Sequence, residues 1–329
     1  MFTENQKGVV FQTETSFNNQ LEERNMSNIN YKPFESRTPD SQYQDLLRQI
    51  MDEGRDLNPI QGESARMIPG LQLRYKMENG FPLITERDMS GKFLQSAIGE
   101  HIAFLNGART QKELEKFGCP WWKRWVTAEK CAVFGLKEGD LGPGSYGAAW
   151  TQFPTSEGAS FDQIEHVVRQ IKERPLLRTH IITPWIPQYT IQHDRLTRKV
   201  VVAPCHGWIH ILAFPESKEL IVHHFQRSSD MPVGVPFNIV QYASFGLMLA
   251  ELTGYTFVEY VHTFSDAHIY NSQYEYVKEL ISREPRRLPT VILDQGAIKG
   301  IDNIKDFRPE HFKLSDYEPH EKMLIPTPV

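Results

Sequence analysis

Hydrophobic residues along the chain recur at two periods, one of about three to four positions and one of about two. The longer period predicts helices at residues 43–54, 93–105, 162–174 and 238–253. Short alternating or continuous apolar runs predict strands at residues 71–77, 208–214, 220–225 and 258–264. No Gly/Ser-rich or Pro-rich linker interrupts this pattern after residue 40. We therefore expect one mixed α/β domain over residues 40–329.

Residues 1–39 differ from the rest, because their first thirty positions are rich in Asn, Gln, Glu, Thr and Ser. Such a polar stretch predicts a variable, flexible extension. It lacks the apolar segment of a secretory signal. The chain has three cysteines and no CxxC pair, which is typical of a reducing compartment. We expect a cytoplasmic protein.

Charge and hydropathy argue against two classes of partner. The net charge of −5 and the pI of about 6.2 are unlike the strongly basic balance of nucleic-acid-binding domains. No apolar run reaches the length of a membrane-spanning helix. We therefore expect neither a nucleic acid nor a membrane as a partner.

The stretch richest in reactive side chains joins Cys205, in the sequence APCH, to residues 226–230, QRSSD. Between them lie the predicted strands 208–214 and 220–225, joined by the turn PESK. A hairpin brings its two ends together, so Cys205 and Arg227 are expected to lie close. A neighbouring guanidinium lowers a thiol pKa, and the thiolate is the nucleophilic form. The structural alternative is an inert buried cysteine and a surface ion pair.

The histidines do not form a convincing metal site. His206 and His210 share one face of a predicted strand, and His223 and His224 are adjacent. No cysteine or carboxylate stands beside them at typical ligand spacing, so we expect no bound metal.

Four blocks of this sequence resemble the signature blocks of the thymidylate synthase family, which includes the pyrimidine hydroxymethylases. They are residues 204–206 (PCH), 226–230 (QRSSD), 234–239 (GVPFNI) and 266–270 (DAHIY). The blocks occur in the family's order and near its spacing, and the resemblance covers most of residues 43–329. It implies a three-layer α/β (α+β) domain with a large mixed sheet, and a homodimer that forms through that sheet.

The resemblance also implies the catalytic groups. Cys205 is the nucleophile that adds to C6 of a pyrimidine, and Arg227 favours its thiolate. Glu100, in the block EHIAFLNG, is the general base that works through ordered water, although by itself it reads as a surface carboxylate on a helix. Tyr146 follows the block DLGPGS, which is one residue longer than in the family, and assists removal of the C5 proton. Asp230 completes the set and anchors a pterin.

The one-carbon donor implied by the resemblance is 5,10-methylenetetrahydrofolate. Trp122 and Trp125 are expected to flank this folate and to keep water away from the reaction centre. The C-terminal carboxylate of Val329 is expected to fold over it as a lid.

The residues expected to bind the nucleotide are Arg178, Arg227, Ser228, Asn238, His268 and Tyr270. Arg178 is implied to reach across the dimer interface to the phosphate held by the other subunit. Thr179 stands where the family has a second arginine, and Arg66 is a candidate replacement. The Asn238 amide suits O4 and N3–H of uracil. Family members that take deoxycytidylate tend to carry aspartate there.

These assignments predict methylation of dUMP to dTMP through a covalent Cys205 adduct. If water replaces hydride in the last step, the product carries a hydroxymethyl group, so a hydroxymethylase acting on dUMP, dCMP or CMP is the alternative. The sequence leaves ribose against deoxyribose open. A nucleotide-binding protein without catalysis is a third interpretation, and the joint presence of Cys205, Glu100, Arg227 and Asn238 argues against it.

Overall fold

The computed structural model of the chain describes residues 28–58, 62–193 and 195–328. The helices are α2 (Gln42–Glu53), α3 (Lys92–Leu105), α4 (Gln111–Glu115), α5 (Ala128–Ala132), α6 (Tyr146–Thr151), α7 (Gln163–Glu173), α8 (Pro187–Thr190), α9 (Gly234–Thr253) and α10 (Tyr274–Ser282). Within these ranges, none of the helices has the length and hydropathy needed to cross a membrane.

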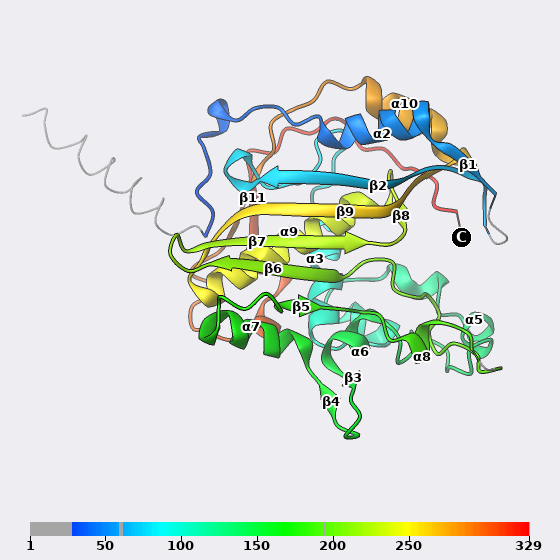
Figure 1. The fold of residues 1–329 in the computed structure, drawn as a ribbon. Coiled ribbons are helices and arrows are strands. Elements are labelled where there is room, and N and C mark those ends of the chain that lie inside the picture. The colour runs from blue at the N-terminus through cyan, green and yellow to red at the C-terminus, as the bar shows by residue number, and fades with distance from the viewer. Residues whose placement is uncertain (1–27, 59–61, 194, 329) are drawn as a thin grey trace, which may run out of the picture.

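The strands are β1 (Arg55–Leu57), β2 (Ala65–Lys76), β3 (Phe153–Pro154), β4 (Ser160–Phe161), β5 (Ile181–Ile182), β6 (Trp208–Phe214), β7 (Glu219–Gln226), β8 (Ser229–Asp230), β9 (Thr256–Tyr270), β10 (Thr290–Leu293) and β11 (Phe312–Ser315). Seven of them form one sheet in the order β1-β2-β9-β7-β6-β5, with β8 also paired to β9 (Figure 1). Strands β7 and β8 run parallel to β9, and the other pairs are antiparallel. The predicted large mixed sheet is therefore confirmed.

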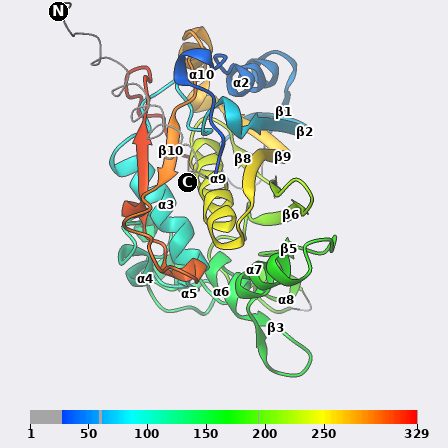
Figure 2. The ribbon, with the colours of Figure 1, turned by 90° about the vertical axis from the view of Figure 1, so that its left-hand side faces the viewer.

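Helix α9 covers one face of the sheet, with α3 beyond it and the β10–β11 pair outermost (Figure 2). The α9 helix can approach β9 closely because it carries Gly246, where a Cβ atom would lie 2.4 Å from the ring of Phe257. No helix in the described ranges covers the opposite face, which is turned toward the viewer in Figure 1. Ile181 and Phe225 are exposed on the strands of this sheet.

The hydrophobic pattern located most of the long elements, and the structure corrects two of their ends. Helix α9 begins at Gly234, so the prediction that Asn238 caps this helix is wrong. Pro236 is tolerated in the first helical turn, where its missing N–H would have no intrahelical partner. Strand β9 continues to Tyr270, which places the whole block 266–270 inside the sheet.

Residues 28–39 pack against the domain, and residues 1–27 of the predicted extension lie outside the described part. Ile29 is buried in the core, and Arg37 is buried with its Nη1 atom donating to the Leu288 carbonyl oxygen at 2.9 Å. The extension therefore contributes its last residues to the folded domain.

Candidate active site

Cys205 and Arg227 meet at the open end of the β6–β7 hairpin, whose last pair is Trp208 and Phe225. The Arg227 backbone N–H donates to the Cys205 carbonyl oxygen at 2.8 Å, and Arg227 Nη2 lies 3.5 Å from Cys205 Sγ. Arg227 Nε also donates to the Pro204 carbonyl oxygen at 2.7 Å, which holds the guanidinium in place. The predicted hairpin and the predicted contact of thiol and guanidinium are confirmed.

The electrostatic expectation for the thiol is wrong in its net sign. Burial raises the pKa of Cys205, and the positive charge of Arg227 opposes that rise only in part. The residue as a whole keeps some contact with solvent, but the thiol is enclosed by protein atoms, so desolvation outweighs the neighbouring charge. Arg227 remains a cation that favours the ionised sulfur.

Tyr146 connects the nucleophile to the helical layer. It is the first residue of α6, and its hydroxyl oxygen accepts a hydrogen bond from the Cys205 backbone N–H at 2.8 Å. Its ring stacks on His206 at a centroid distance of 4.4 Å and on Phe104 at 5.0 Å. Burial raises the pKa of Tyr146 far above its usual value, so the phenol is neutral. The longer DLGPGS block thus still delivers this tyrosine to the cysteine.

Glu100 is buried on α3 and is not a surface carboxylate. Its Oε1 atom accepts hydrogen bonds from the indole of Trp121 at 2.9 Å and from the indole of Trp122. Its Oε2 atom accepts from Gln241 Nε2 at 2.5 Å. Burial raises the pKa of Glu100, while these donors favour its charged form. A carboxylate with a raised pKa suits general-base work near neutral pH.

The Asn238 carboxamide is held from both sides inside the core. Its Oδ1 atom accepts from Gln226 Nε2 at 3.1 Å, and its Nδ2 atom donates to Gln241 Oε1 at 2.9 Å. Because α9 begins four positions earlier than predicted, Asn238 and Gln241 lie one turn apart on the same helical face. The amide is therefore a fixed side chain with one donor hydrogen and one acceptor lone pair left over.

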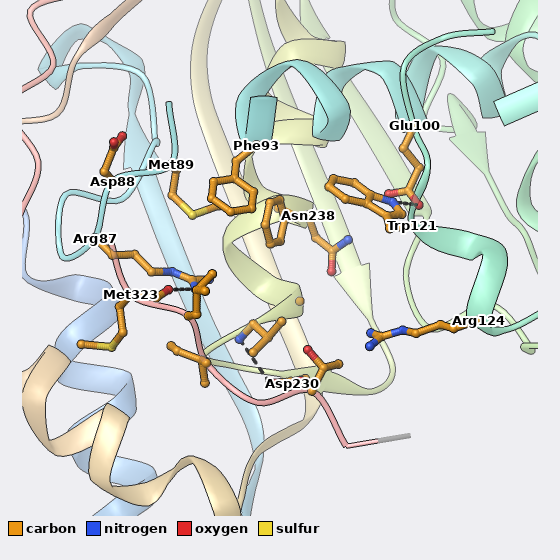
Figure 3. Close-up of a pocket in the computed structure, with 16 residues that line it drawn as sticks. Arg87, Asp88, Met89, Phe93, Glu100, Trp121, Arg124, Asp230, Asn238 and Met323 are labelled. Atoms are coloured by element: carbon orange, nitrogen blue, oxygen red, sulfur yellow. Dashed lines mark hydrogen bonds between the residues drawn. The ribbon is translucent and has the colours of Figure 1, made fainter. Parts of the chain in front are cut away.

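A cavity of about 380 Å³ opens next to Glu100 and Asn238 (Figure 3). Its apolar lining includes Phe93, Trp121, Phe237, Leu324 and Ile325, and its polar lining includes Arg87, Glu100, Arg124, Asp230 and Asn238. The ring of Trp121 meets that of Phe237 edge-to-face at 5.3 Å, so two aromatic rings in contact form part of the cavity wall. Cys205 is not among the lining residues.

The two tryptophans predicted to flank a folate make other contacts. Trp122 contacts the Glu100 carboxylate and meets Phe104 edge-to-face at 6.1 Å. The ring of Trp125 lies under Lys130, whose Nζ atom is 5.1 Å from its centroid. Neither ring lines the cavity, whereas Trp121 does.

Asp230 lies where the cavity meets the C-terminal tail. Its carboxylate oxygens accept from Gln273 Nε2 at 3.2 and 3.3 Å, and the same nitrogen donates to the Pro326 carbonyl oxygen at 2.9 Å. Burial raises the pKa of Asp230 to about 6. The tail thus closes one side of the cavity through residues 323–325 and 327, and the predicted lid residue Val329 lies outside the described residues.

The predicted sugar-binding residues lie beside Asp230, because Asp230 pairs with His268 across β8 and β9. The buried His268 ring is 3.0 Å from Asp266 Oδ1, and its centroid is 4.9 Å from that of Tyr270. Ser228 lies between Arg227 and β8, and its carbonyl oxygen accepts from Gln226 Nε2 at 3.1 Å. These residues therefore belong to the neighbouring strands β8 and β9 and to the segment just before β8.

Arg178 and Thr179 are exposed and lie away from Cys205. Arg178 borders a surface hollow with residues 212–217, at the end of β6 opposite to Cys205. Arg66, the candidate replacement for the arginine missing at Thr179, is already engaged, because it pairs with Asp56 at 3.3 Å and donates to the Met51 carbonyl oxygen at 2.5 Å. Within the described chain, the cations predicted to bind a phosphate are therefore not gathered in one place.

Sequence reasoning missed two residues of this site, Trp121 and Gln241. Trp121 stands directly before the predicted Trp122, so the spacing of the tryptophans alone could not tell which ring faces the cavity. Gln241 is a fully buried polar residue in a helix that is buried nearly all round. A glutamine among apolar helix positions is a detectable signal, since buried polar groups need partners.

A comparison with protein families bears on the whole domain. The family model described as thymidylate synthase matches residues 41–329. The match includes Glu100, Tyr146, Cys205, Arg227 and Asn238, which the structure brings to one region around α3, α9 and the β6–β7 hairpin. Members of this family transfer a one-carbon unit from a folate to C5 of a pyrimidine nucleotide. The chain belongs to the thymidylate synthase family.

Proposed function

We propose that this protein is a thymidylate synthase that methylates dUMP at C5 with 5,10-methylenetetrahydrofolate. The observation that carries the proposal is the linked arrangement of a thiol and an amide–carboxylate pair. Arg227 contacts the Cys205 sulfur, and Gln241 joins Asn238 to Glu100. Such a site can attack a pyrimidine at one ring atom and hold its opposite edge.

The Cys205 thiolate would form a bond to C6 of the pyrimidine. The electron pair of the C5=C6 bond then moves toward C5 and the C4 oxygen, which makes C5 nucleophilic. Arg227 supports this step because its charge favours the thiolate. Tyr146 holds the backbone of the nucleophile through its hydroxyl. The S–C6 bond breaks again when the product is released.

Glu100 would act as the general base for proton transfer at C4 and C5. It lines the cavity, it is buried, and its pKa is raised. In its ionised form it can accept a proton through water, as a general base requires. Asn238 would hold the base with its remaining donor and acceptor, in the pattern that O4 and N3–H of uracil present.

The cavity fits the pterin of a folate. Trp121, Phe237 and Phe93 provide aromatic walls, and the Asp230 carboxylate offers an acceptor for ring N–H groups. When bound, methylenetetrahydrofolate supplies the one-carbon unit and, in the synthase reaction, the hydride. Residues 323–325 and 327 line the cavity and support the role of the tail, with Val329, as a lid over this ligand.

The proposal includes a homodimer in the cytoplasm. The open sheet face with exposed Ile181 and Phe225 supports an interface between two copies. The position of Arg178, at the far end of β6 from its own Cys205, supports a role at the partner's phosphate site. The nucleotide and the folate are then the remaining partners, and no nucleic acid or membrane is required.

The alternative product is a hydroxymethylated nucleotide made from dUMP, dCMP or CMP. One observation favours it, because Trp122 and Trp125, which were expected to exclude water, do not line the cavity. The cavity wall instead depends on Trp121.

The test incubates the full-length protein with methylenetetrahydrofolate and, separately, dUMP, dCMP, UMP and CMP. Dihydrofolate formation and product mass are recorded together. The proposal predicts dihydrofolate and methylated dUMP in equal amounts. A hydroxymethylated product without dihydrofolate would establish the alternative and identify its nucleotide.

A further inference from the structure

A continuous series of seven hydrogen bonds runs through the core from the backbone beside Cys205 to the carboxylate of Glu100. Its members, in order, are Gly207, His224, Tyr260, His262, Gln226, Asn238, Gln241 and Glu100. Their donor–acceptor distances range from 2.5 to 3.4 Å. All the side chains in the series are buried, so solvent does not readily replace a lost partner.

The two ends of the series fix its direction. At one end, the Gly207 backbone N–H can only donate, so His224 Nε2 accepts and the ring carries its hydrogen on Nδ1. At the other end, an ionised Glu100 carboxylate can only accept. Burial lowers the pKa of His224 and of His262 well below the usual value, so both rings are neutral and each has one donor and one acceptor. Every donor in the series then points toward Glu100.

This direction decides which way the Asn238 amide faces. Its Nδ2 atom points toward Gln241 and Glu100, and its Oδ1 atom points toward Gln226. Turning the amide over would place two donors together at Gln226 and two acceptors together at Gln241. Gln241 cannot correct this by turning as well, because its own oxygen would then face the Glu100 carboxylate. The last three residues of the series therefore hold one another in a single arrangement.

We propose that Gln241 is a positioning residue that makes the site bind uracil in preference to cytosine. It does so by holding the Asn238 amide in one orientation through its own hydrogen bond to Glu100. This inference rests on the proposed function, in which Glu100 serves C4 and C5 of the base. The free Nδ2 hydrogen on the Glu100 side then faces C4, where uracil has an acceptor oxygen and cytosine has a donor amino group. The free Oδ1 lone pair faces N3, which is a donor only in uracil.

The experiment measures the dissociation constants of dUMP and dCMP by titration calorimetry, without folate and without turnover. Wild-type protein is compared with Gln241→Met, which keeps the size of the side chain and removes its hydrogen bonds. A matched control is Gln163→Met, because Gln163 is also a buried helical glutamine and donates to the Ala149 and Thr183 carbonyl oxygens at 2.8 Å. We expect wild type and Gln163→Met to prefer dUMP at least about tenfold, and Gln241→Met to lose most of that preference.

A second variant, Glu100→Gln, tests the same point if Gln241→Met fails to fold. Its amide oxygen can keep accepting from Trp121 and Trp122, which places the new amide nitrogen toward Gln241. A donor at that position faces the Gln241 Nε2 donor, so the contact that fixes Gln241, and through it Asn238, is lost. The preference for dUMP should therefore fall in Glu100→Gln as well, in a variant that keeps the shape of the side chain.

The outcomes separate the inference from the proposed function. An unchanged preference for dUMP in both variants would overturn the role of Gln241 and leave the synthase proposal intact. A wild-type preference for dCMP would overturn both the orientation of Asn238 and the choice of substrate. Loss of the dUMP preference in the two variants, but not in Gln163→Met, is the result that supports the inference.

Discussion

The end of the site that holds Glu100, Asn238 and Gln241 is enclosed and connected by hydrogen bonds, whereas the end expected to bind phosphate is open. We call these the base end and the phosphate end; the latter is defined by Ser228 and by Arg178 and Thr179, which we propose serve the site of a second copy of the chain. At the base end, two hydrogen bonds of 2.9 and 2.5 Å join Asn238 to Gln241 and Gln241 to Glu100. At the phosphate end, Arg178 and Thr179 are exposed on the surface.

The difference follows from the role that we propose for each end. Reading a base edge and moving a proton depend on the direction of individual hydrogen bonds, which only a rigid, buried arrangement can fix. Binding a phosphate depends mainly on positive charge within reach, which several arrangements or a second subunit can supply. A phosphate end without the second arginine, as Thr179 leaves it, is therefore compatible with a rigid base end.

The largest effect is expected for Cys205→Ala, which removes the nucleophile. Turnover of dUMP should fall by at least about 10⁴-fold, because no other group can form the bond to C6. The Kd for dUMP should change by less than about threefold, since the base end and the phosphate end are untouched. Steady-state kinetics and calorimetry measure the two quantities. Retained turnover would show that Cys205 is not the nucleophile. The control is Cys131→Ala, which changes a buried cysteine elsewhere.

Glu100→Gln should lower kcat by roughly 10²–10³-fold while dUMP still binds, because the variant removes the general base. In wild type, the rate should fall with decreasing pH as the raised pKa of Glu100 is passed, since only the ionised form accepts a proton. That acid limb should be absent from the pH–rate profile of Glu100→Gln. An unchanged acid limb in the variant would mean that a different group titrates.

Arg178→Ala should raise the KM for dUMP by roughly 10–100-fold, because a charged phosphate contact is lost. A mixing experiment tests whether Arg178 serves the site of the partner subunit. Mixed with Cys205→Ala protein, this variant forms heterodimers in which one site combines an intact Cys205 with the partner's intact Arg178. Activity at low dUMP should then recover to roughly a quarter of wild type. No recovery would place Arg178 at its own subunit's site or outside the site.

Arg66→Ala is the matched cation control for that experiment. Arg66 is occupied by Asp56 and the Met51 carbonyl oxygen, so its loss should change the KM for dUMP by less than about threefold. A larger change would show that Arg66 replaces the second arginine that is missing at Thr179.

The last prediction concerns stability and the variant Asp230→Asn. The Asp230 pKa of about 6 lies above the usual 3.8, so the folded state binds a proton more readily than the unfolded chain. Stability therefore decreases as pH rises from about 4 to about 6, and Asp230→Asn removes that cost. We expect a free energy of unfolding about 1–2 kcal/mol higher than wild type at pH 8, and no gain below pH of about 4. Denaturant unfolding at the two pH values measures it; an equal gain at both would contradict the assigned pKa.

The sequence predicted the parts of the molecule that depend on local pattern. Helices α2, α3 and α7 and the hairpin of β6 and β7 were located because each has one apolar face or a short apolar run between turn residues. The contact of Cys205 with Arg227 followed from that hairpin. The family blocks added Glu100 and Asn238, whose roles have no local signature.

What the sequence could not give depends on contacts between distant residues. Gln241 and Glu100 are 141 positions apart, and nothing in either helix indicates that they meet. The raised pKa of Cys205 arises from enclosure by surrounding segments, which a motif does not describe. The choice of Trp121 over Trp122 as cavity wall depends on the rotation of a short 3₁₀ turn at Trp121–Arg124.

The most direct test of the account follows the hydrogen at C5 of dUMP. The protein is incubated with methylenetetrahydrofolate and dUMP labelled with tritium at C5, and tritium released into water is counted against dihydrofolate formed. We predict one tritium released for each dihydrofolate with wild-type protein, and release of neither with Cys205→Ala. Dihydrofolate formed without tritium release, or tritium release that persists in Cys205→Ala, would contradict covalent activation of the pyrimidine by Cys205.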